Sequence, residues 1–424
     1  MKVRAIVSCM IGNALEWYAF VIFGFFAPTI SQLFFPGSSG TIGLIKAFAL
    51  FGMAFIARPL GAIIFGHIGD RFSRKNALLL SIFVMAIPTV LIGCLPTYAS
   101  IGVFAPILLS VLLVAQGFAI GGEFTGSMVF TIESAPMNQR GFIGSFTTFS
   151  CVIGVILGSL VSLLCTTQFS QEQMLSYGWR LPFIFTLFGT IVGAYIRKNV
   201  GEPTEYIAHK AERKNHAFPL KELFTDHMKS VVCVVLIDFI TAIGFFLLVI
   251  FLPTYLKSHD YLGLDARYAM QINTFNMIVF ALSTLIGGAL SDKYGRKMIF
   301  SYVAFIFLVG GYPIFKLLSY NTTYAPLLAQ FVLALHMGLF FGVIPAGLSE
   351  LFPSVIRFTG LSVSHNISMA LFGGSAPLLA TTLIAAMGDI AAPGILLSLA
   401  ALFCFIGIYY YGDQHRLEQQ MSGY

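Results

Sequence analysis

Long apolar stretches alternate with short polar ones along the whole chain. A helix needs about 20 apolar residues to cross a bilayer. We expect twelve such spans, centred on residues 9–34, 41–66, 77–96, 102–132, 141–166, 179–197, 230–256, 268–290, 298–319, 324–349, 361–387 and 393–412. The pattern predicts an all-α polytopic membrane protein with twelve transmembrane helices in two six-helix halves.

Polar stretches set the expected domain limits. We expect an N-terminal half over residues 1–197, a cytoplasmic linker over 198–229, a C-terminal half over 230–412 and a short cytoplasmic tail over 413–424. Only 10% of the residues are charged, whereas soluble domains carry about 25%. Such a chain cannot cover a water-facing surface, so the composition supports the same class.

The basic residues are distributed unevenly between alternate loops. Most of the 24 lysines and arginines fall in the loops and tails that share a side with the N-terminus. The opposite loops hold only Arg180, Lys257 and Arg267. Because cytoplasmic loops carry an excess of Lys and Arg, we expect both termini in the cytoplasm and a location in the inner (plasma) membrane. This placement explains the net charge of +6 without a nucleic-acid partner.

Two pairs of similar segments indicate an internal repeat. The segment "GHIGDRFSRK" (66–75) is similar to "GALSDKYGRK" (288–297), and "ESAPMNQR" (133–140) is similar to "ELFPSVIR" (350–357). The two pairs have nearly the same separation along the chain and follow the second and fourth spans of each half. Duplicated halves are common among secondary transporters.

These motifs resemble those of the major facilitator superfamily. The stretches "GNALEWYAF" (12–20), "AQGFAIGGEFTG" (115–126) and "WRLPFIF" (179–185) further resemble its metabolite:proton symporter branch, and among them the proline/betaine carriers. The resemblance implies the superfamily fold and transport by alternating access. The chain departs from the branch at Ala19, where relatives usually have an acid, and at Ser73, which replaces a motif glycine.

Charged and polar side chains within the spans are the candidates for function, because a charge in a bilayer core is costly and usually faces a polar interior. The candidates for substrate or proton binding are Glu16, Arg58, Glu123, Asp238, Lys46, Trp17, Tyr18, Asn13 and Gln116. None of the histidines or six cysteines forms a metal-like cluster, so we expect no metal.

Glu16 shares a helix face with Asn13, Trp17 and Phe20, at spacings of three and four residues. It could bind a proton or a cationic substrate group, or it could form a structural ion pair with Arg58 or Lys46. The aromatic rings of this stretch could hold a quaternary ammonium group by cation–π attraction, or they could serve packing alone.

Arg58 and Glu123 are open to two interpretations. The fork of an arginine suits a carboxylate substrate, and Glu123 could be a second proton site. Alternatively, the two residues pair with each other and hold helices together. Asp238 lies in the seventh span, the repeat counterpart of the first. We hypothesise that it replaces the acid missing at Ala19; the alternative is an acid that faces a water-filled vestibule.

The loop motifs suggest a gate on the cytoplasmic side. Asp70 and Asp292 lie at the inner ends of the second and eighth spans, where an acid can cap the positive N-terminus of a neighbouring helix. The resemblance implies a charge network that breaks when the inner gate opens, although the basic residues could serve membrane topology alone. The candidates are Asp70, Arg71, Arg74, Glu133, Arg140, Asp292, Arg296, Glu350 and Arg357.

The leading functional hypothesis is proton-coupled import of a small zwitterionic or carboxylate metabolite. The alternatives are an exporter of a metabolite or drug and, from other classes, a membrane-embedded enzyme or a channel. The sequence contains no H-E-x-x-H or G-x-S-x-G motif, and twin gating motifs argue against a channel. We expect a monomer whose partners are its substrate, protons and the lipid bilayer, with the proton gradient as the coupling ion and no cofactor.

Overall fold

The computed structural model describes residues 2–37, 40–208, 219–257, 262–320, 322 and 324–421. Twelve helical segments within them are long and apolar enough to cross a membrane. Each overlaps one of the twelve predicted spans, so the prediction of twelve helices is confirmed. Helices satisfy every backbone polar group within one segment, which a bilayer core without water requires.

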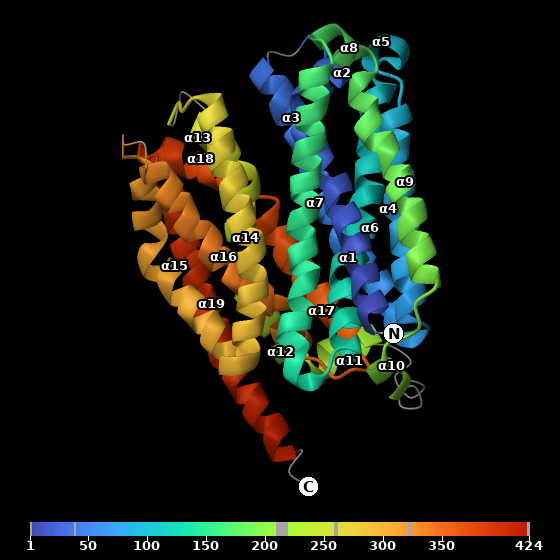
Figure 1. Cartoon of the computed structure of the whole chain (residues 1–424), viewed down its shortest axis with the longest axis vertical. Coiled ribbons are helices and arrows are strands. Elements are labelled where there is room, and N and C mark those ends of the chain that lie inside the picture. The colour runs from blue at the N-terminus through green and yellow to red at the C-terminus, as the bar shows by residue number, and fades with distance from the viewer. Residues whose placement is uncertain are drawn as a thin grey trace. The chain divides into compact units, whose positions relative to one another are not determined.

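The chain divides into two compact units (Figure 1). The first unit comprises Met1–Ser134 and Ser150–Pro219, and the second comprises Ala135–Phe149 and Leu220–Tyr424. The division falls within α7 (Arg140–Gln168), whose first turns pack with the second unit. These units follow packing rather than sequence repeats, so the domain limits expected at residues 197 and 229 stay a prediction.

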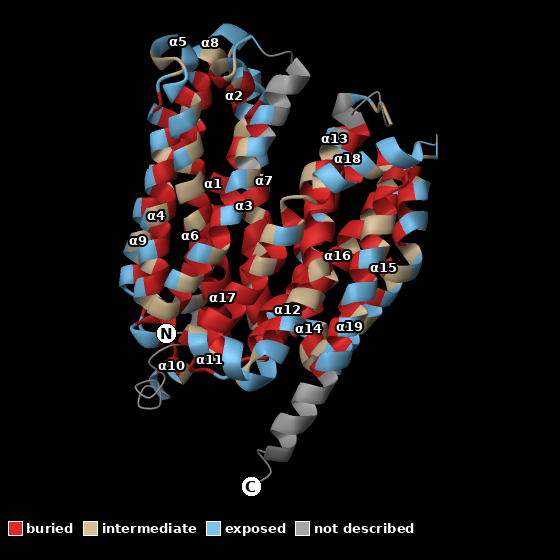
Figure 2. Ribbon diagram, turned by 180° about the vertical axis from the view of Figure 1, so that it is seen from behind, coloured by how far each residue is buried: buried red, intermediate tan, exposed pale blue. Residues whose placement is uncertain are grey.

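The first unit holds the first six spans, except for the start of the fifth, which belongs to the second unit. Its helices, apart from α7, are α1 (Lys2–Phe25), α2 (Ala27–Phe34), α3 (Gly40–Arg71), α4 (Arg74–Cys94), α5 (Tyr98–Ile101), α6 (Phe104–Ser134), α8 (Gln171–Ser176), α9 (Leu181–Lys198) and α10 (Thr204–Ala208). Short 3₁₀ turns, η1 (Met137–Gln139) and η2 (Gly178–Arg180), precede α7 and α9. Large apolar side chains such as Ile56 and Phe104 remain exposed, which suits contact with lipid tails. Figure 2 shows exposed residues, in pale blue, along helices such as α4 and α9.

The second unit holds the other six spans. Its elements are α11 (Pro219–Asp226), α12 (Met228–Ile240), η4 (Thr241–Phe245), η5 (Leu247–Phe251), α13 (Leu252–Lys257), α14 (Ala266–Tyr294), α15 (Arg296–Leu318), α16 (Ala325–Ser349), α17 (Arg357–Ser368), η6 (Met369–Gly373), α18 (Ala376–Met387) and α19 (Pro393–Met421). Two of its spans are not continuous α-helices. The seventh changes to π-helix at η4 and η5, and the eleventh changes at η6. Short π-helical segments are rare and occur frequently at functional sites.

The two repeated motifs begin the following helix in different ways. Gly295 precedes α15 with a φ of 90°, a left-handed conformation that favours glycine. Ser73 precedes α4 with an extended φ of −170°, and its hydroxyl accepts a hydrogen bond from the backbone N–H of Asn76 at 2.9 Å. The departure at Ser73 therefore replaces a glycine turn with a side-chain N-cap.

The stretch expected as a linker contains α10, α11 and residues 209–218, which lie outside the described residues. Its first part packs onto the first unit. Ser73 donates a hydrogen bond to the carboxylate of Glu202, and Thr204 donates to the backbone carbonyl of Glu133 at 3.3 Å. The segment that follows α9 is thus held against the turn between α3 and α4.

Candidate functional site

A buried ion pair connects α6 and α9 within the first unit. Arg197 donates from Nη1 to Oε2 of Glu123 at 2.8 Å and from Nη2 to Oε1. Ser81 of α4 and Ser127 of α6 also donate to this carboxylate, and Arg197 donates to the carbonyl of Leu78 at 2.7 Å. A bidentate, hydrogen-bonded pair of this kind is the arrangement that allows charges to stay buried.

The identity of this partner differs from the expectation. The sequence suggested Arg58 as a partner of Glu123 and did not select Arg197. In the structure Arg197 belongs to α9 and is 3% exposed. Arg197 lies next to the last residue of α9, where a basic residue is usually exposed. Its burial could not be predicted, because the acid that pairs with it lies on another span.

Gly12 makes room for this ion pair. A Cβ atom at Gly12 would lie 2.1 Å from Nη2 of Arg197 and 2.9 Å from Oε1 of Glu123. Real Cβ atoms do not approach other heavy atoms so closely. Gly12, in the stretch that resembles the symporter branch, therefore leaves room for the pair, and a side chain there would have to displace the end of Arg197.

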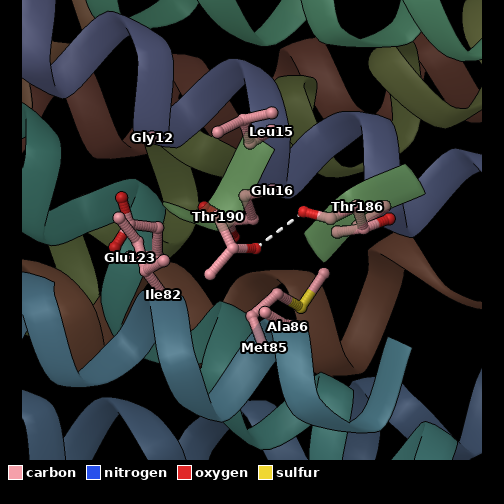
Figure 3. Close-up of a pocket in the computed structure, with 10 residues that line it drawn as sticks. Gly12, Leu15, Glu16, Ile82, Met85, Ala86, Glu123, Thr186 and Thr190 are labelled. Atoms are coloured by element: carbon pink, nitrogen blue, oxygen red, sulfur yellow. Dashed lines mark hydrogen bonds between the residues drawn. The ribbon is translucent and has the colours of Figure 1, made fainter. Parts of the chain in front are cut away.

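Glu16 lies one turn further along α1 and is 4% exposed. Neither oxygen of its carboxylate accepts a hydrogen bond from the described residues. The side chain lines a small pocket with Gly12, Ala19, Glu123 and Thr190, together with Leu15, Ile82, Met85, Ala86 and Thr186 (Figure 3). The pocket has room for about one water molecule.

Charges on three neighbouring groups act on Glu16. Glu123 repels its ionised form, whereas Arg58 and Arg197 attract it. A buried carboxylate without hydrogen bonds has a high free energy, and binding a proton removes that cost. The chemistry that this arrangement can perform is the uptake and release of a proton.

Arg58 lies on α3, opposite a glycine of α6. A Cβ atom at Gly121 would lie 2.2 Å from the carbonyl oxygen of Arg58, so the two backbones are in direct contact. The guanidinium of Arg58 lies over the ring of Phe55, 5.3 Å from its centroid, and the side chain is 1% exposed. The structure thus places Arg58 in the interior of the first unit, as expected for a functional or structural charge.

Four other candidates on α1 and α6 make packing contacts. Asn13 donates to the hydroxyl of Ser150 at 3.1 Å, and Tyr18 donates to the carbonyl of Pro182 at 3.1 Å. Gln116 donates to Thr89 at 2.9 Å and to the carbonyl of Ala19 at 3.3 Å. The ring of Trp17 contacts those of Phe20 and Phe124 edge-to-face. These contacts hold α1 in place, and they leave binding roles for the four residues as predictions.

The remaining two candidates lie elsewhere. Lys46 is exposed on α3, with its ammonium 5.9 Å from the centroid of Phe35. Asp238 is fully buried in α12 of the second unit, where Oδ2 lies 2.7 Å from Nδ1 of His365. No sequence pattern selected His365, because it lies on a different span, 127 residues further along the chain.

The gating candidates of the first unit form an ion-paired cluster. Arg74 donates from Nε to Glu133 at 3.0 Å, from Nη2 to Glu133 at 2.9 Å and from Nη1 to Asp70. All three side chains are fully buried. The ring of Tyr206, from α10, lies 5.4 Å from the guanidinium carbon of Arg74. The cluster joins α3, α4 and α6 at one end of the unit.

The second unit repeats this cluster in a more open form. Arg296 donates from Nη1 to Asp292 at 2.6 Å and from Nη2 to Glu350 at 3.2 Å, and its side chain is 11% exposed. Asp292 also accepts from the backbone N–H groups of Gly141 and Phe142, both at 2.8 Å. Asp292 therefore caps the N-terminus of α7, which is the contact expected for an acid of this motif.

Three gating candidates lie outside these clusters. Arg357 donates to the carbonyls of Ser349 and Phe352, both at 3.2 Å, and so satisfies backbone groups at the end of α16. Arg71 is exposed with its guanidinium over Phe72. Arg140 begins α7 and belongs to the second unit.

Twelve spans, duplicated charge clusters and a buried acid beside an ion pair are typical of a secondary transporter. The chain belongs to the Major Facilitator Superfamily, whose family model matches residues 9–353. Members of this family are transporters rather than enzymes, so the enzyme alternative is set aside.

Two curated relatives indicate which branch of the family this chain resembles. The chain is 33% identical over 412 residues to the proline/betaine transporter of Salmonella typhimurium, which covers 95% of this chain and 82% of the relative. It is 34% identical over 410 residues to the glycine betaine/proline/ectoine/pipecolic acid transporter OusA of Dickeya dadantii, with 94% and 81% covered. The resemblance to proline/betaine transporters is therefore confirmed.

Solved structures confirm the fold. The proton:xylose symporter XylE superposes with a TM-score of 0.79 at 14% identity and covers 97% of this chain and 95% of its own. The transporter FucP in its outward conformation gives 0.66 at 16% identity, with 96% and 98% covered. At these identities the likeness shows the fold alone.

Proposed function

We propose that this multi-pass membrane protein imports a small zwitterionic metabolite, of the proline or betaine kind, together with a proton. The substrate class rests on the relatives, which are named as proline and betaine transporters. The chemistry of a zwitterion also fits a chain that buries both arginine and carboxylate side chains within its spans.

The observation that carries proton coupling is the state of Glu16. Its carboxylate is buried, accepts no hydrogen bond from the described residues and lines a pocket with room for about one water molecule. That space suits a proton, carried in by water, and excludes a substrate the size of proline. The neighbouring carboxylate of Glu123 is held in its ion pair with Arg197. Glu16 has no such partner among the described residues, so in this proposal it is the group that gains and loses the proton.

Transport by alternating access follows from the fold class. A proton gradient directed into the cell would then drive the solute inward. We place the protein in the inner membrane with both termini in the cytoplasm, on the distribution of Lys and Arg. We propose that it works as a monomer, with protons as the coupling ion and no cofactor.

The test is uptake into proteoliposomes. Labelled betaine, proline and a dicarboxylate are offered with and without an imposed proton gradient. We expect the gradient to drive accumulation of a zwitterion in the wild type. Glu16→Gln should lose this accumulation while it retains exchange of labelled for unlabelled substrate, and Glu16→Asp should keep part of both.

Two outcomes contradict the proposal. Gradient-driven accumulation that survives in Glu16→Gln would remove Glu16 from proton coupling. Flux of none of the three compounds in either direction would remove the substrate class.

A further inference from the structure

Asp238 and His365 form a buried acid–imidazole pair in the second unit. Nδ1 of His365 lies 2.7 Å from Oδ2 of Asp238, and the two side chains are 2% and 0% exposed. The residues come from α12 and α17, which belong to the seventh and eleventh spans. A buried carboxylate needs a partner of opposite charge or a proton, and an imidazole can supply either.

The surroundings of the pair contain few other charges. Among the described residues, the thiol of Cys404, on α19, lies near enough to Asp238 for their charges to interact. Lys229 and Arg357 lie near the starts of α12 and α17, nine and eight residues away, which is about 12 Å or more along a helix. The helices η4 and η6 carry no titratable residue. The charge of the pair is therefore set mainly by its own protons.

Both helices change their winding just after the pair. The π-helix η4 begins three residues after Asp238, and η6 begins four residues after His365. The two π-helical segments contact each other. Since π-helical turns interrupt the regular hydrogen-bond ladder and occur frequently at functional sites, the pair lies where both spans are able to bend.

We propose that Asp238 and His365 form a second proton-binding site, carried by the second unit and distinct from the pocket around Glu16. This inference rests on the proposed proton coupling. Nδ1 of His365 and Oδ2 of Asp238 are 2.7 Å apart. Two lone pairs at this separation would repel each other, so we place a hydrogen on Nδ1 when the carboxylate is ionised. One added proton, at Nε2, converts the imidazole to imidazolium, and the charge of the pair changes from −1 to zero.

Whether the pair holds its proton therefore depends on whether water can reach it. While the site is closed, the neutral, protonated pair is favoured because an uncompensated buried charge is costly. When water reaches the site, the negative form is solvated and the proton can leave. A bend at η4 and η6 that admits water would therefore release a proton, which is the coupling that an alternating-access carrier needs.

The first test measures transport. Asp238→Asn and His365→Asn are compared with the wild type for gradient-driven accumulation and for exchange. We expect both variants to lose accumulation and to retain exchange, with a changed pH profile of exchange. His336→Asn is the control: His336 is another buried span histidine, whose Nδ1 contacts the Val332 carbonyl at 2.7 Å and whose Nε2 contacts the Tyr302 hydroxyl at 3.2 Å. It should keep both activities.

The second test observes the proton directly, by NMR of protein labelled at its histidines. We expect a signal that disappears in His365→Asn to change with pH. Asp238→Asn should alter that pH dependence, since a charged neighbour of the ring is lost. Protein folding is checked in each variant by exchange activity and by the His336 signal.

The outcomes separate this inference from the proposed function. If Glu16→Gln loses accumulation while both second-unit variants keep it with an unchanged pH profile, the second site is overturned and the proposed function stands. If the wild type shows no gradient-driven accumulation, the proposed function fails. The NMR experiment then still tests whether the Asp238–His365 pair binds a proton. A His365 signal that does not titrate, or a pH dependence indifferent to Asp238→Asn, overturns the inference.

Discussion

Arg197 holds the carboxylate of Glu123 through both of its terminal nitrogens, across 74 residues of sequence. The pair ties α9 to α6, and it lies beside Glu16, the acid of the pocket that accepts no hydrogen bond from the described residues. The pair therefore lies beside the carboxylate that we propose for proton coupling, and mutations can test the two roles separately.

Loss of Arg197 should destabilise the protein strongly. Removing one partner of a buried ion pair leaves an uncompensated charge, which costs about 3–5 kcal/mol. We expect Arg197→Gln to show this loss in unfolding of the detergent-purified protein. Arg197→Lys should retain part of the stability, since it keeps the charge and loses the bidentate fork. The adjacent, exposed Lys198 is the control, and Lys198→Gln should change little; equal effects at the two positions would contradict the pairing.

Gly12→Ala should disturb the same ion pair from α1. The new Cβ would meet Nη2 of Arg197 at 2.1 Å, and overpacking of this kind costs about 1–3 kcal/mol. Gly24, on the same helix, is the matched control, because a Cβ there meets nothing within 4 Å. We expect Gly24→Ala to be neutral or slightly stabilising in the same unfolding measurement.

A double mutant sharpens the test at Gly12. In an Arg197→Ala background the guanidinium is gone, so Gly12→Ala should cost clearly less than in the wild type. Additive effects of the two substitutions would show that Gly12 is needed for some other reason.

The two charge clusters should differ in their contribution to stability. Arg74 and its partners are fully buried, whereas Arg296 and Glu350 are 11% and 18% exposed. We expect Arg74→Gln to cost about 3–5 kcal/mol and Arg296→Gln to cost less, because water partly solvates the carboxylates that it leaves behind. Thermal unfolding of both variants under one condition gives the ranking, and the reverse order would refute the argument from burial.

Ser73 offers a test of the turn between α3 and α4. Its hydroxyl caps α4 and also donates to Glu202. Ser73→Ala should cost about 1 kcal/mol through the lost cap, whereas a glycine at an N-cap costs only a few tenths. If Ser73→Gly, which restores the motif residue, is as destabilising as Ser73→Ala, the bond to Glu202 is the larger contribution.

Cys94 reports the orientation of the chain. It ends α4 and is exposed, whereas the other five cysteines are buried. With a cytoplasmic N-terminus, the end of the third span lies on the outer face. A membrane-impermeant maleimide added to intact cells should therefore label Cys94. In a Cys94→Ser background, Met137→Cys, between the fourth and fifth spans, should be labelled only after permeabilisation; the opposite pattern would invert the topology.

The sequence by itself determined the class, the twelve spans and the duplicated motifs. Each span is a local property, because a helix satisfies its own backbone and the bilayer sets its length. The charge clusters around Arg74 and Arg296 could also be anticipated, since their motifs repeat at matched positions in the two halves. The same reasoning selected Glu16, Glu123 and Asp238 as buried acids.

Only the tertiary structure decided which partners these acids have. Glu123 binds Arg197 where the sequence suggested Arg58, Asp238 lies against a histidine that no pattern selected, and Glu16 accepts no hydrogen bond from the described residues. The partners lie on different spans, so their meeting depends on the rotation and depth of each helix in its unit. Close contacts such as Gly12 against Arg197 set that rotation, and sequence spacing contains no information about them.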